Sequence, residues 1–165
     1  MKVVYFVRHA KSSWAEPALK DVDRPLNKRG LRDAPFMGKL MNAKESRPDA
    51  LISSPALRAK TTAYYFAEAL GIEKDEVQLN PAIYEAFTGE LLEIVQQLPD
   101  AYDTVMLFGH NPALTSLANK FSSTPIANIP TCGIFKVEAT VASWEAFKEA
   151  NGRLTAFHYP KQYFS

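Results

Sequence analysis

Short apolar runs alternate with longer stretches of helical periodicity along this chain, and no other feature of the sequence constrains its fold as much. Such a chain buries both faces of a mostly parallel sheet under helices, so the pattern predicts an α/β layered domain rather than an all-β or α+β one. The expected elements are strands over 3–7, 50–53, 77–79, 104–108, 133–138 and 153–157, helices over 28–41 (despite Gly30 and Pro35), 54–70, 89–98 and 111–121, and a turn or short helix over 143–148.

Two of the predicted helices carry a start signal. Ser54-Pro55 and Asn111-Pro112 each supply an N-cap residue followed by proline, which is tolerated at the first helical position because its missing amide hydrogen is not needed there. Gly71 is expected to end the first of these two helices, since glycine readily adopts the left-handed conformation of a C-cap.

A polar segment, residues 10–27, separates the first strand from the first helix. Its length and composition are typical of a functional loop, so we expect it to border an active site. Asp21, Asp23 and Arg24 are expected to shape this loop.

The composition bounds the class of protein. The chain has 165 residues, 47% of them hydrophobic, which is enough to bury a core without disulfides, so we expect residues 1–165 to form a single domain. Its 19 basic and 18 acidic side chains leave a net charge of +1, which gives no electrostatic footprint for nucleic acid or an anionic membrane. Any anion recognition must therefore be local.

Cysteine usage and the N-terminus indicate a compartment. Cys132 is the only cysteine, so a disulfide framework and a cysteine-based zinc site are excluded, and a reducing compartment is the simplest interpretation. The first apolar segment ends at Arg8, too short and wrongly flanked for a signal peptide, and no apolar run approaches membrane-spanning length. We expect a cytoplasmic protein with no membrane or nucleic-acid partner.

Three segments share one layout, in which polar residues follow an apolar strand and lead into a loop or a helix start. Arg8 and His9 follow the first strand, Arg58 lies shortly after the second, and His110 follows the strand over 104–108. Parallel strands bring their carboxyl ends to one edge of a sheet, which is where open α/β sheets bind ligands. These four side chains are therefore expected to meet in one pocket.

Arg58 is informative because of its position in its predicted helix. It lies about one turn from the start, where the helix dipole disfavours a cation unless an anion shares the site. A phosphoryl group would supply that anion, and Arg8 and Arg58 can clamp its oxygens in bidentate fashion. Taken alone, Arg58 also fits a simpler interpretation, an ion pair with a surface carboxylate.

The two histidines are assigned different roles. His9 must be neutral to attack phosphorus, so one ring nitrogen should be held as N–H while the other faces the substrate. His110, beside the transferring group, would act as a donor or cation that stabilises its oxygens. Either histidine alone also fits a structural residue at a strand end, and it is the shared layout that favours a site.

Two further residues are candidates. Glu85 lies between a predicted strand and a predicted helix and would serve as a general acid if burial raised its pKa, although a solvated loop carboxylate is an equal alternative. Ser12 is placed to donate a hydrogen bond to phosphate, or equally to cap the local loop.

With these residues in place, the chain resembles the histidine phosphatase superfamily, and most closely its short SixA-type phosphohistidine phosphatase branch. The motifs run in the family's order and cover most of the chain, which is far more specific than a lone Arg-His-Ala tripeptide. The matching segments are Val7-Arg8-His9-Ala10-Lys11-Ser12, Arg24-Pro25-Leu26 with Arg29-Gly30, Ser53-Ser54 followed by Arg58-Ala59 and Thr61, Gly109-His110-Asn111-Pro112, and Pro130-Thr131-Cys132-Gly133.

The resemblance implies a three-layer α/β/α sandwich with a mostly parallel central sheet, as in phosphoglycerate mutases. It also implies no metal or other cofactor, a phosphohistidine intermediate on His9, and a phosphate pocket built from Arg8, Arg58 and His110. Phosphoglycerate mutases look similar around the first motif, but there an acidic residue usually occupies the position of Lys11 and the chains are longer. Mutase activity is therefore disfavoured.

Glu85 falls near the superfamily's usual proton donor, which SixA-type members do not reliably keep. A leaving imidazole can take its proton from solvent, whereas a phosphoester alkoxide has a greater need of an acid. The leading hypothesis is therefore a metal-independent phosphatase that forms a covalent phosphohistidine on His9, with a phosphohistidine-containing protein or a small phosphorylated molecule as its substrate.

Three alternatives stay open. A small-molecule phosphomonoesterase or mutase of the same superfamily would use the same pocket. A phosphate-recognising module with weak or no turnover would also keep the arginines, although binding alone does not require a nucleophile. A histidine metal site is disfavoured because the histidines are far apart in sequence and no ligand-spaced carboxylate accompanies them.

Overall fold

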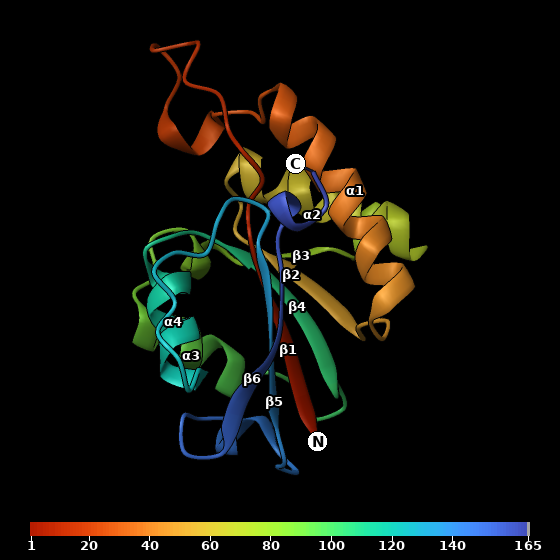
Figure 1. Ribbon diagram of the computed structural model, residues 1–165, viewed down its shortest axis with the longest axis vertical. Helices are drawn as coiled ribbons and strands as arrows, with labels where there is room; N and C mark the ends of the chain where they lie inside the picture. The colour runs from red at the N-terminus through yellow and green to blue at the C-terminus, as the bar shows by residue number, and fades with distance from the viewer. Residues whose placement is uncertain (165) are drawn as a thin grey trace.

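A computed structural model describes residues 1–164 and places one six-stranded sheet between two layers of helices (Figure 1). The strand order is β3-β2-β4-β1-β5-β6. The elements are β1 (Lys2–Arg8), α1 (Lys28–Lys44), β2 (Ala50–Ser53), α2 (Leu57–Leu70), β3 (Gln78–Leu79), α3 (Thr88–Gln96), β4 (Thr104–Gly109), α4 (Ala113–Phe121), β5 (Ile134–Ala139) and β6 (Gly152–His158). Every predicted strand and helix is present, and the expected short helix is a 3-10 turn over Trp144–Ala146.

The sheet is mostly parallel. β1, β2, β3 and β4 pair in parallel, while β5 pairs antiparallel with β1 and β6 antiparallel with β5. Helices α1 and α2 cover one face and α3 and α4 cover the other (Figure 1). The prediction of a three-layer α/β/α sandwich is confirmed.

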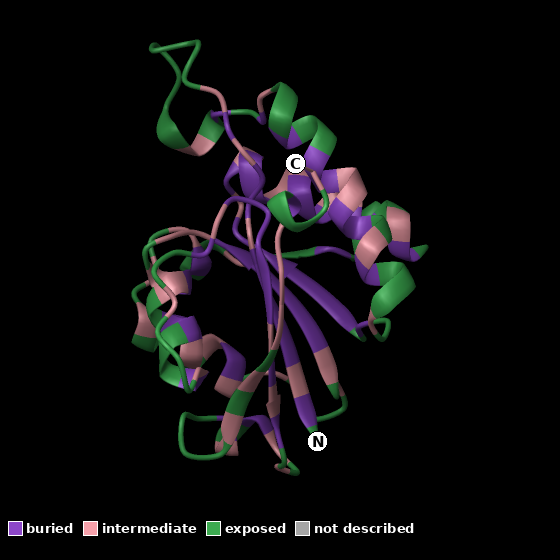
Figure 2. Ribbon diagram, viewed as in Figure 1, coloured by how far each residue is buried: buried purple, intermediate pink, exposed green. Residues whose placement is uncertain are grey.

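Alternation along β1 sends its side chains to two cores. Tyr5 and Val7 pack under α1 and α2, whereas Val4 and Phe6 pack under α3 and α4. Figure 2 shows the central strands as mostly buried and the outer sides of the helices as exposed. The sheet is therefore a rigid support for the loops at its edges.

The loop between β1 and α1 rises above the carboxyl edge of the sheet (Figure 1). Its two ends are tied together where the backbone N–H of Asn27 donates to the carbonyl of Lys11 at 2.9 Å. A Cβ atom on Gly30 would lie 2.2 Å from that carbonyl oxygen. Helix α1 can begin this close to the loop only because residue 30 is glycine.

A turn before β5 holds the end of β1 from the other side. The backbone N–H of Gly133 donates to the carbonyl of Pro130 at 2.8 Å, and Cys132 has a φ of 59° at the third position of this turn. The N–H of Cys132 donates to the carbonyl of His9, and the N–H of Arg8 donates to that of Gly133, each at 3.0 Å. The backbone of the Arg8-His9 pair is therefore fixed on both sides.

Helices α2 and α4 begin later than predicted. Ala56 and Pro112 occupy the N-cap positions expected for Ser54 and Asn111, so the prolines expected as first helical residues lie outside the helices. The N–H of Ser54 donates to the carbonyl of Phe108 in β4 at 3.0 Å, which holds Ser54 against the end of the sheet and away from the helix start. The side chain of Asn111 still accepts a hydrogen bond at 3.1 Å from the backbone N–H of Thr115, in the first turn of α4, but Asn111 lies one residue before the N-cap.

The other helix ends lie within three residues of the predicted ones. Gly71 ends α2 with a φ of 70°, as predicted. Asn27 is the N-cap of helix α1, and its side chain accepts a hydrogen bond from the backbone N–H of Gly30 in the first turn. The helix continues to Lys44, three residues beyond the predicted end, and contains Pro35. Among residues 1–164, no helix combines the length and apolar character needed to cross a membrane.

Candidate active site

Arg8, His9 and His110 lie where β1, β4 and β2 end side by side. Arg8 pairs with Gly109 across β1 and β4, and the N–H of His9 donates to the carbonyl of Gly109 at 3.1 Å. The rings of His9 and His110 lie 5.2 Å apart between centroids. The predicted convergence of strand ends is observed, because the three strands are parallel neighbours in the sheet.

His9 is held as a neutral imidazole with one defined tautomer. Its Nδ1 atom lies 2.7 Å from the carbonyl oxygen of Ala10, and since a carbonyl only accepts, Nδ1 carries the proton. The lone pair is then on Nε2. The residue is only 8% exposed, and desolvation, reinforced by His110, Arg58 and Arg8, lowers its pKa to about 3.

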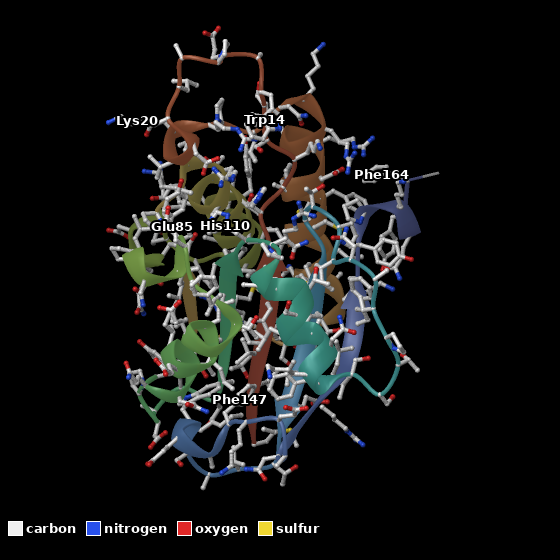
Figure 3. The ribbon with its side chains drawn as sticks, turned by 90° about the vertical axis from the view of Figure 1, so that its left-hand side faces the viewer. Trp14, Lys20, Glu85, His110, Phe147 and Phe164 are labelled. Atoms are coloured by element: carbon white, nitrogen blue, oxygen red, sulfur yellow. The ribbon has the colours of Figure 1, made fainter. Side chains whose placement is uncertain are left out.

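His110 is positioned by a hydroxyl of the neighbouring strand end. Its Nε2 atom lies 2.8 Å from Oγ of Ser54, which follows β2. Its Nδ1 atom is buried without a hydrogen-bond partner. Desolvation, followed by the charge of Arg58, lowers the pKa of His110 to about 4. Figure 3 shows His110 in the upper half of the molecule, below Trp14, and Phe147 toward the lower end.

Arg8 is fixed through one nitrogen and leaves another free. Its Nη1 atom donates to the carbonyl of Ile129 at 2.9 Å, while Nε is buried and has no partner. Burial of a guanidinium N–H without an acceptor is costly, so this atom marks a place where an anion would be stabilised.

Arg58 lies in the first turn of α2 and is paired with Asp21 of the β1–α1 loop. Its Nη1 atom donates to the Asp21 carbonyl at 2.7 Å, and its Nη2 atom donates to Oδ2 of the same residue at 2.9 Å. The simpler interpretation of Arg58, an ion pair with a carboxylate, thus describes the ligand-free protein, but that carboxylate belongs to the loop over the site. Thr62 links α2 to the end of β1, since its hydroxyl accepts from the N–H of Ala10 and donates to the carbonyl of Arg58.

Asp21 is the centre of a polar network at the mouth of the site. Its Oδ1 atom accepts from Arg24 at 3.0 Å, and Oδ2 accepts from the Tyr84 hydroxyl as well as from Arg58. These hydrogen bonds, that of Tyr84 foremost, hold the pKa of Asp21 well below its usual range. The guanidinium of Arg24 in turn lies 3.3 Å from the ring centroid of Trp14. The loop is shaped by Asp21 and Arg24, as predicted.

Ser12 and Glu85 are placed differently from the other candidates. The Ser12 hydroxyl accepts from Arg24, which fits the alternative in which Ser12 supports the loop. Glu85 is exposed, so the burial on which its role as a general acid depended is not present. It nevertheless lines a cavity of about 280 Å³ together with His110 and Tyr84. Figure 3 shows Glu85 and His110 at similar height below Trp14.

A ligand could also bind in another cavity or, if it is a metal ion, between clustered side chains. A cavity of about 810 Å³ along α2, lined by Tyr64, Tyr65 and Lys74 among others, contains none of the predicted site residues. Within the described range 1–164, no three His, Cys, Asp or Glu side chains gather closely enough to hold a metal ion.

Comparison with known proteins identifies the family of this arrangement. The sequence profile of the histidine phosphatase superfamily (branch 1) matches residues 4–103. This chain belongs to that superfamily. An uncharacterized protein of Mycobacterium tuberculosis (strain H37Rv) is 30% identical over 165 residues, which cover 94% of this chain and all of that protein.

Solved histidine phosphatases share the fold over nearly the whole chain. A protein of Agrobacterium tumefaciens assigned as phosphohistidine phosphatase SixA is 27% identical, with a TM-score of 0.77 over 96% of this chain and 98% of that one. The protein histidine phosphatase SixA in complex with tungstate has 20% identity and a TM-score of 0.80, over 97% of this chain and 98% of that one. The prediction of a SixA-like histidine phosphatase, and hence of a phosphatase enzyme, is confirmed.

Sequence reasoning missed three contributors to the site of this histidine phosphatase. The link from Asp21 to Arg58 spans 37 positions, and no local pattern signals it. The sequence predicts a helix cap at Ser54, although its place directly after a buried strand is a usable signal for a site residue. Tyr84 precedes Glu85 in the chain, and only its hydrogen bond to Asp21 shows that it contributes to the site.

Proposed function

We propose that this protein is a metal-independent phosphohistidine phosphatase that works in two steps through a covalent phosphohistidine on His9. One observation carries the proposal. The His9 imidazole is buried and neutral, its Nδ1–H is fixed by the Ala10 carbonyl, and a lone pair is left on Nε2. A strand-end residue with a merely structural role would not need one tautomer to be fixed beside two arginines.

In the first step, Nε2 of His9 attacks phosphorus in line with the bond to the leaving group. The new P–N bond forms as the old bond breaks, and the electron pair of the old bond leaves with the leaving group. His9 keeps its Nδ1 proton and becomes an N-phosphorylated ring whose N–H still faces the Ala10 carbonyl. Preorganisation of this kind requires little rearrangement during the reaction.

The phosphoryl oxygens would be held by the groups that lack partners in the free protein. Arg8 Nε and His110 Nδ1 are both buried without a hydrogen bond, and Arg58 has five N–H donors of which two are used by Asp21. Guanidinium groups thereby supply the positive charge that a metal ion supplies in other phosphatases. For this role His110 must carry its proton on Nδ1, with Ser54 donating to Nε2.

In the second step, water attacks phosphorus from the position that the leaving group has vacated. The P–N bond to His9 breaks, its electron pair returns to Nε2, and inorganic phosphate is released. The neutral imidazole is regenerated for the next cycle, which the low pKa of His9 favours.

Phosphohistidine is the substrate class that the placement of the acids favours. Glu85, the candidate acid, is exposed, so a leaving group that needs little protonation is preferred. The similarity to SixA proteins points the same way. A small phosphomonoester is the second candidate, favoured by the position of Glu85 in one cavity with His110.

The test offers the intact protein a phosphohistidine-bearing protein, free phosphohistidine, an aryl phosphate and a panel of sugar and glycerate phosphates, each with and without a chelator. We expect phosphate release from phosphohistidine to be fastest and insensitive to the chelator. Glu85→Gln should slow alkyl phosphates and leave phosphohistidine unchanged.

A matched pair of variants makes the test specific. His9→Asn should abolish turnover, whereas His158→Asn should retain it, because His158 lies on β6 with its Nε2 on Glu45. Normal turnover by His9→Asn would overturn the proposal. Binding of a phosphohistidine protein without phosphate release would instead support the recognition module.

A further inference from the structure

We propose that Asp21 accepts a hydrogen bond from the leaving imidazole of the phosphohistidine substrate, so that this carboxylate selects N-phosphoryl over O-phosphoryl substrates. This inference rests on the proposed function and concerns the side of the reaction opposite His9. The argument uses the position of Asp21, its ionisation and its remaining capacity to accept hydrogen bonds.

Asp21 lies at the mouth of the site, on the side that the in-line reaction would assign to the leaving group. His9 is 8% exposed at the floor of the site, so a group that departs opposite its Nε2 must face the mouth. The side chain of Asp21 is 49% exposed at that mouth and is bonded to Arg58, whose charge acts on both His9 and His110. Tyr84 lies on the same side, with its ring edge-on to that of His110 at 5.6 Å between centroids.

Asp21 can accept but not donate. Hydrogen bonds from Tyr84, Arg58 and Arg24 hold its pKa below the usual range, so it is a carboxylate throughout the physiological range and cannot act as a general acid. A carboxylate has about four acceptor positions, and the three observed hydrogen bonds leave one on Oδ1. That position is available to an N–H group of a substrate.

Asp21 is also held still. Both its backbone carbonyl and its Oδ2 atom accept from the two terminal nitrogens of Arg58. The 3-10 turn Asp21–Asp23 is further tied through Arg24, whose Nε donates to the carbonyl of Ser13 at 3.1 Å. An acceptor fixed in this way loses little conformational entropy when a substrate arrives.

The chemistry of P–N cleavage explains why an acceptor is needed. In a phosphorylated imidazole, the ring nitrogen distal to phosphorus can carry a proton, and only then does the ring leave as neutral imidazole rather than as imidazolate. Asp21 would stabilise that distal N–H. When Nε2 of His9 forms its bond to phosphorus, the electron pair of the old P–N bond passes to the proximal nitrogen, and the distal proton stays on the departing ring.

The site would then treat its two imidazoles alike. The Ala10 carbonyl holds the distal N–H of His9, and the Asp21 carboxylate would hold the distal N–H of the substrate. Transfer between two similarly held rings is close to balanced in free energy. An alkoxide or phenolate leaving group carries negative charge instead, which a fixed carboxylate repels, so Asp21 would disfavour phosphoesters.

The experiment compares kcat/KM for free phosphohistidine and for p-nitrophenyl phosphate in the wild-type protein and in Asp21→Asn. Asp23→Asn is the matched control, because Asp23 is an exposed carboxylate in the same turn. The ratio of the two kcat/KM values does not depend on the fraction of protein that is folded. Asp21→Glu, which keeps the charge, is the second variant.

We expect the ratio of phosphohistidine to p-nitrophenyl phosphate kcat/KM to fall at least about 10-fold in Asp21→Asn, as loss of a charged hydrogen bond predicts, in addition to any loss through Arg58 that both substrates share. Asp23→Asn should keep the wild-type ratio, and Asp21→Glu should restore part of it. Equal losses on both substrates would overturn the inference, since Asp21 would then only orient Arg58. If the wild-type protein hydrolyses p-nitrophenyl phosphate but not phosphohistidine, the proposed function itself fails, and the inference with it.

Discussion

The Nδ1 atom of His9 lies 2.7 Å from the carbonyl oxygen of Ala10, the next residue along the chain. This contact fixes the tautomer of a histidine that burial keeps neutral. Because the backbone there is tied to the turn before β5 and to the end of β4, the acceptor does not move. In the proposed mechanism, this contact defines Nε2 of His9 as the attacking atom.

Stability should fall with acid in a window set by the buried histidines. An unfolded histidine binds a proton near pH 6.5, whereas His9 and His110 in the folded protein resist protonation down to about pH 3 and about pH 4. The unfolded state therefore binds more protons between these values, and the free energy of unfolding drops as the pH is lowered. Each histidine contributes roughly 1.4 kcal/mol per pH unit.

Urea denaturation between pH 7 and pH 4.5 measures this slope. His9→Asn should reduce the slope by about the contribution of one histidine, and His158→Asn supplies the comparison for a histidine outside the site. The same depressed pKa means that kcat keeps no inflection near pH 6.5 from His9. A slope identical in His9→Asn and wild type would contradict the assignment.

Arg58→Lys should reduce kcat/KM by about 100-fold or more, because a lysine cannot keep the Asp21 contacts and also offer N–H groups to phosphate. Steady-state kinetics with phosphohistidine and p-nitrophenyl phosphate check this loss on both substrates. Arg153→Lys, an exposed position on β6, should be indistinguishable from wild type. Retention of more than about a third of the activity by Arg58→Lys would exclude the clamp.

Ser54→Ala tests how His110 is positioned. Loss of the hydroxyl 2.8 Å from Nε2 should lower kcat about 5- to 30-fold with little change in KM. Ser53→Ala removes a neighbouring buried hydroxyl that donates to the Ser54 carbonyl and not to the histidine, so kcat should be close to wild type. Equal effects of the two variants would mean that only local packing matters.

Gly30→Ala should be destabilising by about 2 kcal/mol, because the new methyl group would meet the Lys11 carbonyl of the loop that follows His9. Gly89→Ala is the matched change in a helix, where a Cβ meets nothing within 4 Å, and it should stabilise by up to about 1 kcal/mol. Thermal denaturation separates the two. A neutral Gly30→Ala would show that the loop yields at little cost.

The strands and the convergence of Arg8, His9 and His110 could be predicted because both follow from short-range rules. An apolar run such as residues 3–7 strongly favours a buried strand, and neighbouring parallel strands end at the same edge of the sheet. The order β3-β2-β4-β1 then places the polar residues that follow β2, β4 and β1 next to one another at one edge of the sheet.

The helix starts and the environment of Arg58 could not be predicted, because long-range hydrogen bonds decide them. Ser54 has cap chemistry, yet its backbone hydrogen bond to Phe108 holds it at the end of β2, two residues before the N-cap of α2. Asp21 has loop chemistry, yet its partner lies in α2. Nothing local distinguishes a carboxylate that shapes a loop from one that reaches an arginine across the site.

Trapping the reaction intermediate tests the central claim most directly. The intact protein is mixed with a 32P-labelled phosphohistidine-bearing protein, quenched in alkali within a single turnover, and digested for peptide mapping. The account predicts an acid-labile, alkali-stable label on the peptide that contains His9, present in wild type and absent from His9→Asn. A label on another residue, or full turnover with no labelled protein at any time, would contradict it.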